Sequence, residues 1–253
     1  MSAPGGWDLF WMLTRTEFRL RDQGTAAGFL WTLLHPLFIF LILYVLFTRW
    51  MAPLIPDFAA YLLIGIVQWN FFSSGTSAGL SSLRRKAGLI ASYAFPRVFV
   101  VLSSVCAVLL SHLLEWAVAL AALAAMGVRP TAFWLCLPLL IGLELALVTG
   151  LSAVLALLAV DVRDLDRVWS IFLYGFFFLT PVFYAAEVVS APAWQLVALN
   201  PLTVIITATR AALLGGTCRP PAGAWLLAAA CAALGAAALA CFGRLSRGVA
   251  EKL

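Results

Sequence analysis

Long apolar segments separated by short polar connections dominate this chain of 253 residues. Hydrophobic residues make up 64% of the sequence and charged residues only 11%, a balance that a soluble core with a polar surface does not reach. A helix needs roughly 20 apolar residues to cross a hydrocarbon core of about 30 Å. Six segments meet this need, and we expect each to span a membrane: residues 27–47, 58–83, 98–126, 133–160, 168–186 and 222–242.

Little sequence remains outside these spans, so we expect one all-α transmembrane domain covering residues 1–253. Before the first span, aromatic residues recur at helical spacing and predict an amphipathic helix on the membrane surface. The alternative is an amphipathic helix that only packs on the protein. The aromatic residues are Trp7, Phe10, Trp11 and Phe18.

Two further apolar segments, residues 191–199 and 202–214, are too short to cross a bilayer. They lie between the fifth and sixth spans and are separated by Asn200 and Pro201. We therefore expect two re-entrant half-helices that enter the membrane from one face.

The distribution of basic residues predicts the orientation. With six spans both termini share a side, and that side holds all but four of the 16 Lys and Arg residues. Positive residues favour the cytoplasmic side, so we expect both termini in the cytoplasm and the half-helices on the outer face. The four exceptions are Arg49, Arg129, Arg210 and Arg219.

The loop after the second span holds the densest basic run, Arg84, Arg85 and Lys86. A half-apolar piece, residues 87–95, follows it and ends before Pro96, which cannot continue a helix without losing a hydrogen bond. We expect the basic run to face water, a short helix to follow it, and the loop to receive force from a separate soluble motor. The alternative is a solvated loop that is held inside by its charge.

The second half of the second span reads SSGTSAGLSS and is rich in small and hydroxyl residues. Small residues let helices approach closely in lipid, and hydroxyl groups form hydrogen bonds between helices. This composition predicts a helix–helix contact, with a pore lining as the alternative.

Nucleotide and metal chemistry are not expected in this chain. A P-loop needs a lysine after a glycine, whereas Lys86 follows Arg85 and Lys252 follows Glu251. Any ATP and magnesium would therefore be bound by another subunit, and we expect no cofactor here.

The acidic loop after the fourth span contains Asp161, Asp164 and Asp166, but Arg163 and Arg167 are interleaved with them. We expect this loop to dock onto a partner rather than to bind a metal. A membrane-embedded polyprenyl-phosphate transferase that uses the three aspartates is the enzymatic alternative.

Three ionisable residues, His112, Glu115 and Glu144, lie deep within predicted spans. In an antiparallel pair of helices the two glutamates have similar depths near the middle of the membrane. Such residues are costly in lipid and indicate function by default. The alternatives are a proton relay, a hydrophilic lining for a polar substrate, and a static interhelical hydrogen bond with a protonated glutamate.

Several motifs follow one another along the chain: Arg21 with Gly28, Phe29, Leu30, Trp31 and Pro36; Gly65 with Trp69, Asn70, Phe71 and Phe72; Phe95-Pro96-Arg97; Arg163-Asp164; Thr180-Pro181-Val182-Phe183-Tyr184; and Asn200-Pro201-Leu202 with Arg210. Their order and spacing resemble the permease subunit of bacterial ABC-2 type polysaccharide exporters. One departure is Ser92-Tyr93-Ala94, where the family commonly has a lysine before Phe-Pro-Arg.

The resemblance implies a homodimer in the bacterial inner membrane that works with two copies of a nucleotide-binding ATPase. It implies a cargo of lipid-linked polysaccharide such as O antigen, capsule or teichoic acid, with a permease for small hydrophobic compounds as the alternative; nucleic acid is not an expected partner. The expected roles are lipid pyrophosphate binding by Arg19 and Arg21; channel lining by Glu115, Glu144, Trp169, Tyr174 and Tyr184; ATPase coupling by Arg84, Arg85, Lys86, Asp161, Arg163 and Asp164; and an outer gate at Asn200, Pro201 and Arg210.

Overall fold

A computed structural model gives the fold, and among the residues it describes all regular structure is helical. The described residues are 6–22, 30–93, 95–185, 188–190, 195, 197–215, 233, 237 and 242. The elements are α1 (Gly6–Asp22), α2 (Leu30–Met51), α3 (Phe58–Arg85), α4 (Ala87–Ser92), α5 (Val98–Ala125), the 3-10 helix η1 (Ala132–Cys136), α6 (Leu137–Asp161), α7 (Leu165–Leu179) and α9 (Pro201–Leu213).

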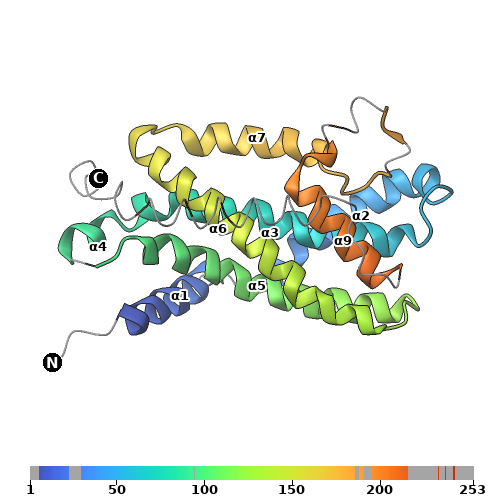
Figure 1. The fold of residues 1–253 in the computed structure, drawn as a ribbon, viewed down its shortest axis with the longest axis horizontal. Coiled ribbons are helices and arrows are strands. Elements are labelled where there is room, and N and C mark those ends of the chain that lie inside the picture. The colour runs from blue at the N-terminus through green and yellow to red at the C-terminus, as the bar shows by residue number, and fades with distance from the viewer. Residues whose placement is uncertain are drawn as a thin grey trace.

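Helix α3 is the axis of the molecule, with α5 and α6 packed against it as its most extensive neighbours. Its 28 residues make it about 42 Å long at 1.5 Å per residue. Helix α2 packs on α3, and α1 lies against α5 (Figure 1).

The small residues of α3 explain how closely α6 approaches it. A Cβ atom on Gly75 would lie 2.6 Å from a methyl carbon of Val148, and one on Gly79 would collide with the side chain of Ser152. The hydroxyl of Ser152 also donates a hydrogen bond to the Gly75 carbonyl at 3.4 Å. The prediction of a helix–helix contact along the second half of α3 is therefore confirmed.

Three helical segments among the described residues are long and apolar enough to cross a membrane: Leu30–Met51, Val98–Ala125 and Ala132–Asp161. They correspond to the predicted first, third and fourth spans. The predicted sixth span and most of the first half-helix lie outside the described residues, so six spans and a re-entrant pair stay predictions.

The predicted fifth span, residues 168–186, is wrong at its end because α7 stops at Leu179. The following residues Thr180, Pro181 and Val182 turn instead of continuing the helix. Proline disfavours the helical conformation of the residue before it, which explains the break at Thr180. The resulting α7 has 15 residues, about 22 Å in length.

Helix α1 shows the predicted amphipathic pattern. Phe10 and Leu13 are buried, and the ring of Phe10 packs on Phe99 of α5 with centroids 6.1 Å apart. Trp7 and Trp11 on the same helix are 72% and 60% exposed. The helix thus packs on the protein with one face and leaves tryptophans exposed on another, whereas its position on a membrane surface stays a prediction.

Candidate functional site

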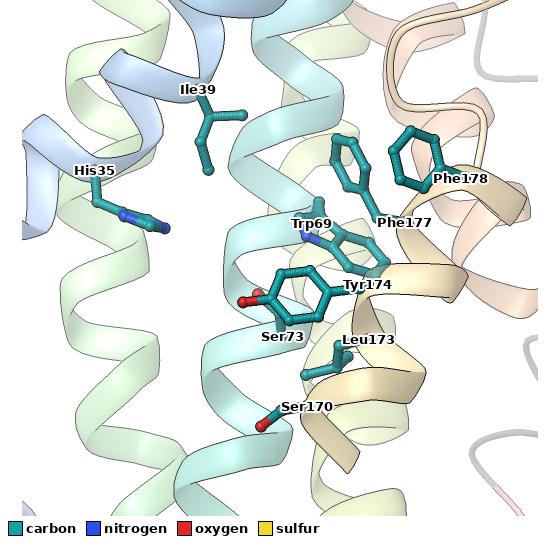
Figure 2. Close-up of a pocket in the computed structure, with 9 residues that line it drawn as sticks. All are labelled: His35, Ile39, Trp69, Ser73, Ser170, Leu173, Tyr174, Phe177 and Phe178. Atoms are coloured by element: carbon teal, nitrogen blue, oxygen red, sulfur yellow. The ribbon is translucent and has the colours of Figure 1, made fainter. Parts of the chain in front are cut away.

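An aromatic cavity of about 450 Å³ lies between α2, α3 and α7 (Figure 2). The side chains of His35 and Tyr174 point toward this space from α2 and α7, and Trp69 of α3 lies just above the Tyr174 ring in the view. The cavity is lined by His35, Ile39, Trp69, Ser73, Ser170, Leu173, Tyr174, Phe177 and Phe178.

Ring packing holds the wall of the cavity in place. Trp69 meets Phe177 edge to face, with ring centroids 5.2 Å apart, so α3 and α7 are joined through aromatic contacts. Tyr174 is 76% exposed, which leaves its hydroxyl available to a ligand. Aromatic faces together with the hydroxyls of Ser73 and Ser170 offer both stacking and hydrogen bonding.

Of the five predicted lining residues, Tyr174 alone belongs to this cavity. Trp169 stacks on Phe172 at 5.0 Å and donates a hydrogen bond to Thr76 at 3.2 Å. Tyr184 is buried, and its hydroxyl donates to the Phe178 carbonyl at 3.0 Å. A lining role for Trp169, Tyr184 and the two glutamates stays a prediction.

A buried polar chain joins α3 to α5. The side-chain amide of Asn70 donates to both carboxylate oxygens of Glu115, at 2.9 and 3.0 Å. On α5, the indole of Trp116 donates to Nε2 of His112 at 2.8 Å, so Nε2 carries no proton there. One of the three alternatives for these residues, an interhelical hydrogen bond, is therefore present at Glu115 with Asn70 as the partner, whereas protonation of the glutamate stays a prediction.

Glu144 of α6 is also fully buried, and neither of its carboxylate oxygens has a hydrogen-bond partner among the described residues. It interacts electrostatically with Glu115, which agrees with the similar depth predicted for the two residues. Burying an unpaired carboxylate is costly, so Glu144 is the least satisfied polar side chain of this region.

Arg210 of α9 joins three separate parts of the chain. Its guanidinium donates to the carbonyls of Tyr61, Pro181 and Val182, at 3.1, 2.7 and 2.7 Å. It also lies over the ring of Tyr61, with its central carbon 3.3 Å from the ring centroid. Arg210 therefore fixes α9 to α3 and to the turn after α7.

Asn200 adds a second connection to the same turn. Its amide nitrogen donates to the Thr180 hydroxyl at 2.9 Å, while its side-chain oxygen accepts from the Leu202 nitrogen at 2.9 Å. The second bond is an N-cap, and Pro201 takes the first helical position, where its missing N–H costs nothing. The residues predicted as an outer gate thus lie together around the break after α7; their gating role stays a prediction.

The side chains of the basic run form ion pairs with acidic residues of the same chain. Lys86 Nζ lies 2.8 Å from a carboxylate oxygen of Glu17, and Arg85 lies 3.7 Å from the same carboxylate. Only 13% of the Lys86 side chain is exposed, so the expectation that the whole run faces water is wrong for this residue. Burial lowers the pKa of Lys86, and the hydrogen bond to Glu17 opposes that shift.

Arg84 extends this network to the loop after α6. It forms an ion pair with Asp166 and donates to the carbonyl of Arg163 at 2.9 Å. Asp164 pairs instead with Arg167 at 3.4 Å, and both are exposed. The residues predicted for ATPase coupling therefore come together at one end of the bundle, whereas their contact with an ATPase stays a prediction.

The predicted lipid pyrophosphate residues lie on α1. Arg19 is exposed, and the side chain of Arg21 lies outside the described residues. Sequence reasoning did not identify Glu17, although it is the acid that holds the basic run to α1. No local signal indicates this pairing, because Lys86 is 69 positions away.

Comparison with known proteins supplies the family. Residues 8–214 match the ABC-2 type transporter family. Among the similar proteins is one from Klebsiella pneumoniae named O-antigen export system permease protein RfbA, 29% identical over 83% of this chain and 81% of its own length. A protein of the same name from Myxococcus xanthus is 30% identical over 79% of this chain and 77% of its own length.

Proposed function

The chain belongs to the ABC-2 type transporter family, and from this premise we propose that it exports a lipid-linked polysaccharide, with O antigen as the expected cargo. It is a membrane permease with apolar helices, and transport rather than catalysis is its role in this family. The names of the similar proteins support O antigen over capsule or teichoic acid.

The aromatic cavity between α2, α3 and α7 is the structural observation that supports a glycan. Sugar rings have apolar faces that stack on aromatic side chains and hydroxyl groups that need hydrogen-bond partners. The cavity offers both, through rings such as Trp69 and Phe177 and through the hydroxyl of Tyr174. Stacking contacts are individually weak, so a polymer is able to slide past them.

A second copy of the chain would complete this site. Large apolar side chains are exposed on two of the three helices that border the cavity, including Phe38 and Ile42 of α2 and Ile171 and Phe178 of α7. A homodimer that pairs these faces encloses the cavity as a channel, with Asn200, Pro201 and Arg210 at its outer end.

A separate ATPase supplies the energy. Two copies bind at the end formed by Lys86, Arg84 and Asp164 and hold the ATP and magnesium, while this chain binds no cofactor. Both termini lie on the same cytoplasmic side of the inner membrane as that ATPase.

Replacing Tyr174 by alanine tests the cargo. In a strain that lacks the native gene, Tyr174→Ala should reduce surface O antigen several-fold at equal membrane levels of the protein, because a ring and a hydroxyl leave the cavity wall. Phe133→Ala is the matched control, since Phe133 is an exposed aromatic residue of η1 that lies outside both the cavity and the expected coupling loop. Surface glycan is measured by antibody binding and by the length distribution of the extracted polymer.

The alternative, a permease for small hydrophobic compounds, predicts another outcome. Tyr174→Ala would then leave surface glycan unchanged and alter the tolerance of the cells to hydrophobic toxins. That result, or equal glycan loss in Phe133→Ala, contradicts the proposed cargo site.

A further inference from the structure

A groove of about 590 Å³ lies between α1 and α5, and its lining combines apolar and cationic side chains. This composition differs from the aromatic cavity, because two guanidinium groups border a surface of apolar side chains and the threonines Thr14 and Thr16. The apolar members are Trp11, Met12, Phe18 and Leu110, and the cationic members are Arg15 and Arg19.

The acidic residue Glu17 and the basic residues Arg15 and Arg19 lie on different faces of α1. Glu17 faces the end of α3, where Lys86 binds it at 2.8 Å. Arg15 and Arg19 are one helical turn apart, so both lie on the groove side. Both are exposed, and neither forms a hydrogen bond or ion pair with another described residue. The acid between them in sequence is engaged elsewhere, so neither cation has a counter-charge among the side chains that the structure describes.

The groove lies along the side of the apolar helix α5 and not beyond an end of that helix. Helix α1 meets α5 at Phe99, where the Trp7 ring lies 6.4 Å away, and the groove reaches Leu110. Eleven residues of α5 separate these contacts, about 16 Å along the helix. An arginine at this level keeps its aliphatic stem on apolar surface and extends its head toward lipid phosphates.

We propose that Arg15 and Arg19 bind the phosphate of an anionic phospholipid of the surrounding bilayer, with an acyl chain against Phe18 and Leu110. Guanidinium groups match phosphate oxygens in bidentate geometry, and the two free positive charges complement an anionic head group. The groove is formed by α1 and α5, whereas α7 of the aromatic cavity runs along the other side of α3 (Figure 1). A bilayer lipid therefore fits the groove better than the cargo does, and the inference does not depend on the proposed function.

Native mass spectrometry of the delipidated full-length chain tests the site. We expect phosphatidylglycerol to bind more tightly than phosphatidylethanolamine with the same acyl chains. The double variant R15Q/R19Q should bind phosphatidylglycerol roughly tenfold more weakly, since both phosphate contacts are lost. The matched control R49Q/R129Q removes two exposed arginines from other parts of the chain and should bind as the unmodified protein does.

Thermal unfolding of both double variants shows whether the fold is kept, and R15K/R19K, which retains the charges, should recover part of the affinity. Equal weakening in R49Q/R129Q, or unchanged binding in R15Q/R19Q, overturns the proposal. It is also overturned if R15Q/R19Q loses binding of polyprenyl pyrophosphate while phosphatidylglycerol binding is kept, since the groove then belongs to the cargo lipid.

Discussion

At the scale of single residues, Arg210 shows how a buried cation is accommodated without a carboxylate. It is 5% exposed and forms no ion pair among the described residues, but three carbonyls and the ring of Tyr61 surround its guanidinium. The turn after α7 has lost its helical hydrogen bonds, so the carbonyls of Pro181 and Val182 need donors. Arg210 supplies these donors and thereby stabilises the break in the helix.

Gly65 makes room for this arrangement, which gives a prediction. A Cβ atom at Gly65 would collide with the Arg210 guanidinium and lie 2.7 Å from the Val182 carbonyl oxygen. Gly65→Ala should lower the free energy of unfolding by about 1–3 kcal/mol, the usual effect of overpacking. The measurement is reversible unfolding in detergent micelles.

Gly142 of α6 provides the matched control, because a Cβ atom there would have no atom within 4 Å. Gly142→Ala should leave stability unchanged or raise it by less than about 1 kcal/mol, as alanine favours helix more than glycine does. Equal stability of Gly65→Ala and the unmodified chain would show that the Arg210 contact is not tightly packed.

At the scale of helices, α1 is held by two kinds of contact. Phe10 and Leu13 bury apolar surface on one face, and Glu17 forms an ion pair with Lys86 at the end of α3. The Lys86 amine also donates to Ser103 of α5 at 3.2 Å, so one side chain connects three helices. A force applied to the basic run would reach α1 and α5 through Lys86.

Removing the carboxylate of Glu17 tests this connection. Glu17→Gln should loosen α1, because Lys86 keeps its buried position and loses its charged partner. We expect backbone amides of α1 to exchange with solvent more rapidly, by an amount that corresponds to roughly 1–3 kcal/mol. Hydrogen exchange measured by mass spectrometry gives this value.

The control for that experiment is on the same helix. Asp8 is exposed and forms no ion pair among the described residues, so Asp8→Asn should remove only the small contribution of an acid in the first turn of α1, about 0.3–1 kcal/mol, and raise exchange less than Glu17→Gln does. Equally fast exchange in both variants would show that the net charge of α1 matters, and that the pairing with Lys86 does not.

Helix boundaries were predictable where the signals are local. The predicted span at residues 98–126 matches α5, Val98–Ala125, because Pro96 and Gly127 border one continuous apolar run. The end of α7 was missed because apolar residues continue past Leu179. The groups that stabilise the break, Asn200 and Arg210, lie 20 or more residues further along the chain and give no local signal.

The residues of the candidate site were likewise predictable where the signal is local, and their contacts with distant residues were not. Sequence reasoning named Tyr174 and Glu115 by residue type and position and Arg210 through the family resemblance, but it did not give their partners. Asn70 contacts Glu115 because α3 and α5 pack together, a tertiary fact that spacing within one helix does not encode.

At the scale of the whole molecule, the two ends of the bundle differ in chemistry. Helix α4 and the connection between α6 and α7 lie at one end, and α9 lies with the connection between α5 and α6 at the other (Figure 1). The first end holds the ion pair of Lys86 and the pair of Arg84 with Asp166. At the second end, Arg210 contacts carbonyls rather than acids.

The expected orientation stays a prediction, and exposed positions at the two ends allow a direct test. Single cysteines are placed at Tyr93, after α4, and at Arg129, between α5 and η1, in a chain whose own five cysteines are replaced by serine or alanine. An impermeant maleimide should label position 129 in intact spheroplasts and position 93 only after the membrane is permeabilised, because basic residues favour the cytoplasmic side. Both positions are exposed, so a lack of labelling is not explained by burial. Labelling of position 93 in intact spheroplasts would reverse the orientation and place the Lys86 network on the side where no ATPase is able to reach it.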